Sequence, residues 1–81
     1  MKNYIAFAWS TEDEGGVGIR INDGKNLKSR RVEDIGEFDT AEELAAILIK
    51  DDPYYYDEDN AIVDAQKLIK DYNRNHDEEV Y

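Results

Sequence analysis

The stretch Lys2–Ser10, KNYIAFAWS, decides the fold, because as an extended chain it is largely apolar on both of its faces. One face carries Ile5, Phe7 and Trp9, and the other carries Tyr4, Ala6 and Ala8. A strand with one solvated face alternates between apolar and polar residues, which this stretch does not do. The sequence therefore predicts a β-strand in the centre of a sheet.

The next strand is predicted at Val17–Asn22, which alternates between inward apolar residues and outward ones. Asp23-Gly24 then has the composition of a two-residue hairpin turn, because both residues tolerate a positive φ. A third strand is expected from Lys25 to about Val32, with a bulge or an early end, because Leu27 and Val32 have opposite parity. Its bases are typical of an exposed edge: Lys25, Lys28, Arg30 and Arg31.

A helix is predicted after the strands. It begins within Phe38–Leu44, FDTAEEL, where Thr40 can cap the helix and Glu43 can reach back to it. The helix is expected to end at Asp51-Asp52-Pro53, because the residue before a proline is pushed out of helical geometry.

A second helix follows, capped by Asp57 or Asp59 and expected to run to about Arg74. Beyond it, residues 76–81 are predicted to form a flexible polar tail. The order of three strands and two helices predicts a single α+β domain over residues 1–81. In it, a three-stranded antiparallel sheet carries both helices on one face.

The formal net charge of the 81-residue chain is −10, and the segment 33–59 carries all of it. That segment holds the base Lys50 and these acids: Glu33, Asp34, Glu37, Asp39, Glu42, Glu43, Asp51, Asp52, Asp57, Glu58 and Asp59. Carboxylates repel phosphates, so the sequence argues against direct binding to nucleic acid or to an anionic membrane. The lack of cysteine and of a secretory signal favours a cytoplasmic location.

No residue set predicts an enzyme, a cofactor or a metal site. His76 lies in the predicted tail, whereas a general base needs a fixed position. The glycines at 15, 16 and 18 precede a strand, while a phosphate cradle needs a helix N-terminus behind it. A calcium loop that starts at Asp57 fails, because Ile62 stands where glycine is required and Leu68 where glutamate is required.

The most distinctive local feature is the segment DDPYYYDED, residues 51–59. Three consecutive tyrosines cannot all face a core, and exposed tyrosines among acids make a good protein-binding surface. The alternative is that the tyrosines close the end of the helix pair and the acids keep the protein soluble. The candidate partner-binding residues are Glu33, Asp34, Glu37, Asp51, Asp52, Tyr54, Tyr55, Tyr56, Asp57, Glu58 and Asp59.

Two resemblances point to one class of protein. The element order, the small size, the acidity and the FDTAEEL motif resemble phage-encoded anti-defence proteins, such as anti-CRISPR proteins and other DNA mimics. That resemblance implies carboxylates and tyrosines presented to the basic groove of a nucleic-acid-handling protein. Pro53-Tyr54-Tyr55 followed by Asn60-Ala61 is similar to a stretch of barstar-type nuclease inhibitors, whose chain order differs from that predicted here.

Two hypotheses follow. The first is a non-enzymatic acidic protein that blocks the nucleic-acid-binding surface of a basic partner, of the nuclease or CRISPR effector type. The second is a small structural or regulatory module with an ordinary acidic surface, which forms a homodimer through the edge of its sheet.

Overall fold

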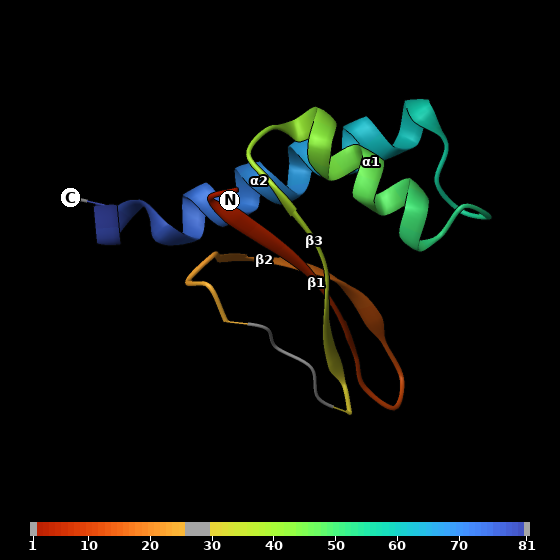
Figure 1. The fold of residues 1–81 in the computed structure, drawn as a ribbon, viewed down its shortest axis with the longest axis horizontal. Helices are drawn as coiled ribbons and strands as arrows, with labels where there is room; N and C mark the ends of the chain where they lie inside the picture. The colour runs from red at the N-terminus through yellow and green to blue at the C-terminus, as the bar shows by residue number, and fades with distance from the viewer. Residues whose placement is uncertain (1, 26–29, 81) are drawn as a thin grey trace.

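A central strand organises the fold in the computed structural model, which describes residues 2–25 and 30–80 and, for residues 75–80, the backbone alone. β1 (Tyr4–Ser10) pairs antiparallel with β2 (Gly15–Ile21) on one side and with β3 (Val32–Phe38) on the other. The strand order is therefore β2-β1-β3 (Figure 1). The prediction of a central first strand in a three-stranded antiparallel sheet is confirmed.

The two pairings of β1 differ in regularity. With β2 the register is continuous, from Tyr4 opposite Ile21 to Ser10 opposite Gly15. With β3 the register shifts between Ala6, which lies opposite Gly36, and Phe7, which lies opposite Asp34. Ile35 is the extra residue, so β3 carries a β-bulge at its centre.

The predicted hairpin at Asp23-Gly24 and the predicted strand from Lys25 to Val32 are wrong. Asn22 Oδ1 accepts a hydrogen bond from the Gly24 amide, and Asp23 Oδ1 accepts one from the Lys25 amide, both at 3.0 Å. These side-chain turns, with Gly24 at a φ of 83°, end the ladder with β1 after Asn22 and turn the chain out of the direction of β2.

The third strand starts only at Val32, because it pairs with β1 and not with β2. Both outer strands are antiparallel to β1 and so parallel to each other, and the chain has to return along the sheet before β3 begins. Residues 26–29 of the predicted strand lie outside the described residues.

Both helices begin at side-chain caps. In α1 (Ala41–Asp51), Thr40 accepts a hydrogen bond from the Glu43 amide, as predicted. In α2 (Glu58–Val80), the cap is Asp57, whose Oδ1 accepts from the amides of Asp59 and Asn60, both at 2.9 Å.

The predicted end of the second helix near Arg74 is wrong, since α2 continues to Val80. The apolar stripe of the sequence fades there, but residues 75–80 contain neither proline nor glycine, so nothing in them breaks the helical backbone. Tyr81 lies outside the described residues.

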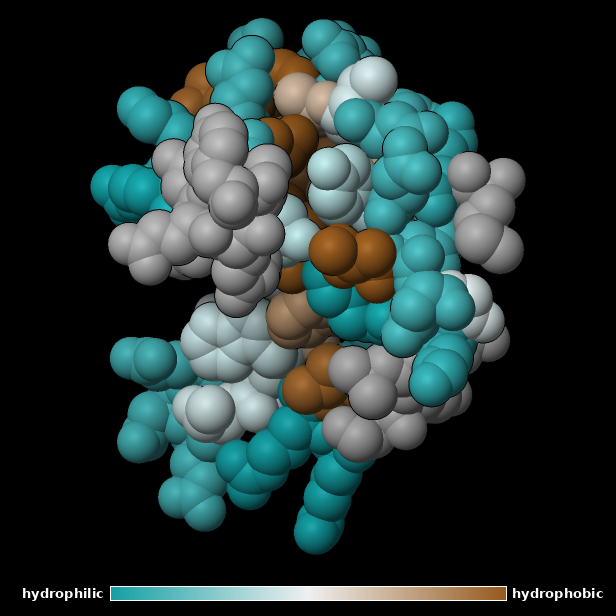
Figure 2. All heavy atoms as spheres, turned by 90° about the vertical axis from the view of Figure 1, so that its left-hand side faces the viewer, coloured by the Kyte–Doolittle hydropathy of each residue, from teal (hydrophilic) through white to brown (hydrophobic). Residues whose placement is uncertain are grey.

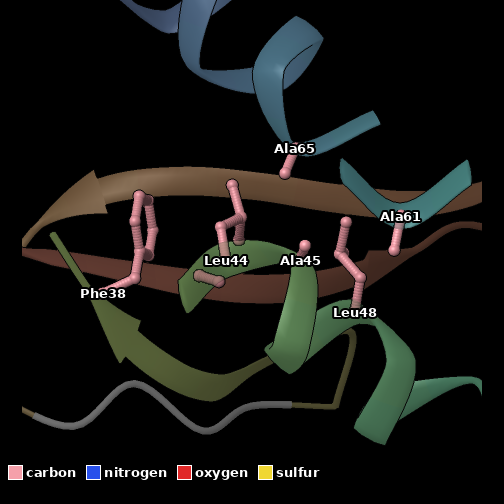
Figure 3. Close-up of a cluster of buried hydrophobic side chains, with 7 residues drawn as sticks. Phe38, Leu44, Ala45, Leu48, Ala61 and Ala65 are labelled. Carbon is pink, nitrogen blue, oxygen red and sulfur yellow. The ribbon is translucent and has the colours of Figure 1, made fainter. Parts of the chain in front are cut away.

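The helices form a second layer on one face of the sheet, as predicted (Figure 1). Figure 3 shows the core between the layers, where the largest fully buried side chains are Phe38, Leu44 and Leu48. The small residues Ala61 and Ala65 on α2 are also fully buried, which lets that helix approach α1 closely. The core thus fixes the end of α1 relative to the start of α2, and with them the segment that joins the two helices.

Candidate partner-binding surface

The segment that joins the helices, residues 51–59, is called the connector here. It lies at one end of the helical layer (Figure 1) and holds five acids and no base. Its turn is built on Asp52, whose carbonyl accepts hydrogen bonds from the amides of Tyr55, at 3.3 Å, and Tyr56, at 3.0 Å. The Asp52 carboxylate also accepts from the Tyr55 amide at 3.3 Å. The connector is therefore a hydrogen-bonded turn.

Asn60 fastens the connector to the first turn of α2. Its side-chain amide donates to the Tyr55 carbonyl at 2.8 Å, and its Oδ1 accepts from the Asp57 amide at 2.7 Å. Together with the Asp57 cap, this forms a reciprocal pair like a capping box, with asparagine in place of glutamate. The sequence analysis gave Asn60 no role in the cap, although its spacing of three residues from Asp57 carries that signal.

The three tyrosines of the connector differ in exposure. Tyr54 is 100% exposed and Tyr55 is 64% exposed, whereas Tyr56 is half-buried and packs against the core. The rings of Tyr55 and Tyr56 meet edge to face, with centroids 4.8 Å apart. Tyr54 and Tyr55 are thus presented to solvent, and the ring of Tyr55 rests on that of Tyr56.

Tyr56 is the anchor of this group. Burial is the largest effect on the Tyr56 hydroxyl and a hydrogen bond to the Asp64 carboxylate is the second, and together they raise the pKa of Tyr56 to about 12. Both effects favour the neutral phenol over the phenolate, and Tyr56 and Asp64 line the same hollow. Tyr56 is therefore the tyrosine to which the alternative from the sequence applies, in which a tyrosine closes the end of the helix pair.

The acids of the connector divide by what they contact. Asp52 and Asp57 hold the turn and the helix cap. The carboxylates of Asp51, Glu58 and Asp59 are in exposed residues and form no hydrogen bond or ion pair within residues 2–25 and 30–74. These three are the carboxylates that a partner can reach without disturbing the fold.

The remaining candidate acids belong to the sheet and not to the connector. Asp34 forms an ion pair with Arg20 at 2.6 Å, and the two side chains are 16% and 22% exposed. The hydrogen bond from Arg20 to Asp34 raises the pKa of the Arg20 guanidinium. Glu37 accepts a hydrogen bond from the Asn22 side chain, and Glu33 is exposed on β3 opposite Ala8. The predicted set thus falls into two groups on different elements.

The described part of the chain contains no group of three or more histidine, cysteine, aspartate or glutamate side chains able to hold a metal ion. Within the same residues, no helix combines the length and the apolar character needed to cross a membrane. Comparison of the chain with family models, with curated proteins and with solved structures finds no match.

Proposed function

We propose that this protein is a non-enzymatic inhibitor that covers a basic, nucleic-acid-binding surface of another protein, with the connector as its contact surface. The observation that supports the proposal is the exposure of Tyr54 and Tyr55 in a fixed turn that contains five acids and no base. An aromatic side chain held outward in a turn serves as an anchor at an interface.

The charge of the connector gives the anchors a preferred partner. A surface of one sign attracts the opposite sign over about 10 Å at ordinary ionic strength, which speeds association and selects basic partners. Asp51, Glu58 and Asp59 flank the exposed tyrosines, and their carboxylates form no hydrogen bond or ion pair with the described residues. Proteins that bind nucleic acid carry such basic surfaces, because phosphate contacts dominate their affinity.

Contacts within the fold leave a smaller set of candidate contact residues than the sequence offered. Asp34 is already paired with Arg20, and Glu37 already accepts a bond from Asn22, so both stabilise the sheet. Tyr56 is turned inward. The proposed contact residues are therefore Asp51, Tyr54, Tyr55, Glu58 and Asp59.

The test uses two charge variants with the same change in net charge. The connector variant is Asp51→Asn, Glu58→Gln, Asp59→Asn, and the control variant is Glu12→Gln, Asp13→Asn, Glu14→Gln in the turn before β2. Binding kinetics are measured against a panel of basic nucleases and CRISPR effectors at low and high salt. We expect salt-sensitive binding, and we expect the connector variant to associate about tenfold more slowly than the control variant.

A second variant, Tyr54→Ala with Tyr55→Ala, tests the anchors without changing the charge. We expect faster dissociation with a nearly unchanged association rate, because the anchors act after the encounter. If the two charge variants slow association equally, the connector is not the contact surface. If no member of the panel binds, the proposed class of partner is wrong.

A further inference from the structure

Three aromatic rings meet where the start of β1, the end of β3 and the later turns of α2 come together. The Tyr4 ring stacks on Phe38, with centroids 5.6 Å apart. It also meets Tyr72 edge to face, with centroids 5.9 Å apart and ring planes at 77°. Phe38 is fully buried and supports Tyr4, whereas Tyr4 and Tyr72 are half-buried. Two partly accessible rings therefore form a corner.

The three rings line a hollow of about 210 Å³, to which Ile19 of β2 and Ile69 of α2 add aliphatic walls. Figure 2 views the molecule from the end toward which α2 extends and shows hydrophobic atoms gathered between hydrophilic ones. Pockets for drug-sized ligands usually measure about 300–1,000 Å³, so this hollow suits a smaller ligand.

Among the described residues that line the hollow, the one charged group is the carboxylate of Asp39. Its Oδ1 accepts a hydrogen bond from the Asn3 amide at 2.8 Å, which fixes its position. Lys2 interacts with Asp39 through its charge but forms its ion pair with Glu43. Asp39 forms no ion pair within residues 2–25 and 30–74. The hollow thus combines aromatic walls with a carboxylate whose charge no ion pair neutralises.

We propose that this hollow binds a small quaternary ammonium ion of the choline type. The faces of aromatic rings attract a cation, and the methyl groups that surround the nitrogen pack against the rings and the aliphatic walls. Asp39 adds the attraction of opposite charge, whereas a neutral ligand would shield this carboxylate from water without a counter-charge. The net charge of −10 also raises the concentration of small cations near the protein.

This site is separate from the connector. The connector leads into the start of α2, whereas Ile69, Tyr72 and Asn73, which line the hollow, lie in later turns of that helix (Figure 1). The ligand proposed here is a small ion, and the partner proposed for the connector is a basic protein. Either proposal can therefore fail while the other holds.

The experiment is an NMR titration of the full chain with choline chloride, at an ionic strength held constant with sodium chloride. The neutral control ligand is 3,3-dimethylbutan-1-ol, in which carbon replaces the nitrogen of choline. We expect saturable binding of choline in the millimolar range, with shifts of the Tyr4 and Tyr72 ring signals. The neutral alcohol is expected to bind about tenfold more weakly. This comparison uses the wild type and does not depend on any variant.

A pair of charge variants tests the carboxylate. Asp39→Asn keeps the acceptor for the Asn3 amide and removes the charge. The matched control is Asp13→Asn, at an exposed acid in the turn before β2, which changes the net charge by the same amount. We expect Asp39→Asn to weaken choline binding about fivefold, the upper range for a partly exposed pair of charges. Asp13→Asn is expected to bind choline like the wild type.

A second pair of variants tests the rings. Tyr72→Leu removes one wall of the corner and is expected to weaken choline binding about tenfold. Tyr55→Leu removes an exposed ring from the connector and is expected to bind choline like the wild type.

Four outcomes overturn the proposal. Choline may not be taken up saturably, or it binds no more tightly than its neutral counterpart. Equal weakening by Asp39→Asn and Asp13→Asn would mean that the general field of the protein, and not the hollow, attracts the ion. Loss of choline binding in Tyr55→Leu would place the ion on the connector.

Discussion

Gly18 shows how a missing side chain positions an aromatic ring. The Phe7 ring lies over Gly18, so that an added Cβ would meet ring atoms at 2.4 to 3.0 Å. A real Cβ does not come that close, and the ring would have to move off the sheet. Gly18 is therefore required by packing, although its φ is not in the left-handed region.

Gly18→Ala is expected to lower the free energy of unfolding by about 1–3 kcal/mol, the usual cost of overpacking. In a Phe7→Ala background the same change is expected to be neutral or stabilising, because the ring is gone and alanine is favoured over glycine in a strand. Chemical denaturation of the four proteins in this cycle measures the coupling. Additive effects of the two substitutions would show that the ring and the glycine do not depend on each other.

Tyr56 makes stability depend on alkaline pH. Its pKa rises from 10.0 to about 12 on folding, so the fold favours the protonated phenol. The stabilisation is complete below pH 10 and is lost as the pH rises toward 12. Ultraviolet titration should show a tyrosine that ionises near pH 12 and is missing in Tyr56→Phe. The variant should also lose less stability than the wild type between pH 10 and 12, and an identical loss in both would argue against this role.

At the scale of an element, the start of α1 depends on Thr40. Its hydroxyl accepts from the Glu43 amide at 3.2 Å, and the Glu43 carboxylate accepts from the Asp39 amide at 3.2 Å. Glu43 also pairs with Lys2, and the hydrogen bond from Lys2 holds the pKa of Glu43 below its usual value. The cap of α1 is thus linked to the segment that leads into β1.

Thr40→Ala is expected to cost about 1 kcal/mol of stability, because the first turn of α1 loses its side-chain acceptor. Thr40→Ser keeps the hydroxyl and is the control. Urea denaturation measures both variants. Equal losses for alanine and serine would show that the methyl group of Thr40, and not the cap, carries the effect.

Elements with local signals were predictable from the sequence. The caps at Thr40 and Asp57 follow from spacings of three residues, and β1 follows from its two apolar faces. The position of the third strand was not predictable, because it depends on pairing with a strand more than twenty residues away. The strong local turn signal of Asp23-Gly24 favoured a hairpin instead. Phe38, fully buried beside Leu44, belongs to that long-range pairing.

The candidate surface was predictable in composition but not in orientation. The sequence places tyrosines and acids together, yet which ring turns inward depends on the contact between Tyr56 and Asp64 and on the bond from Asn60 to Tyr55. Glu33, Asp34 and Glu37 were predicted to join the connector because all of them belong to the acidic segment 33–59. The sheet holds Asp34 and Glu37 in bonds of its own.

At the scale of the whole molecule, the charge is unevenly distributed, and repulsion between like charges lowers the free energy of unfolding. Five carboxylates lie within the nine residues of the connector, and unfolding lets them move apart. Salt screens their repulsion and is therefore expected to raise the free energy of unfolding.

The size of that effect can be separated from general salt effects by the connector variant Asp51→Asn, Glu58→Gln, Asp59→Asn. Thermal unfolding is followed in rising sodium chloride for the wild type and the variant. The wild type should gain more stability, because the variant has less repulsion to screen. Equal gains in both proteins would mean that the connector carries no electrostatic strain.

The contacts of Tyr4 have a consequence for how the protein is made. Its ring stacks on Phe38 and meets Tyr72 edge to face, with centroids 5.6 and 5.9 Å apart. β1 emerges early from the ribosome, but the residues that cover this strand emerge only with β3 and with α2. During synthesis the most apolar strand therefore waits uncovered until the acidic segment 33–59 and then α2 have left the ribosome.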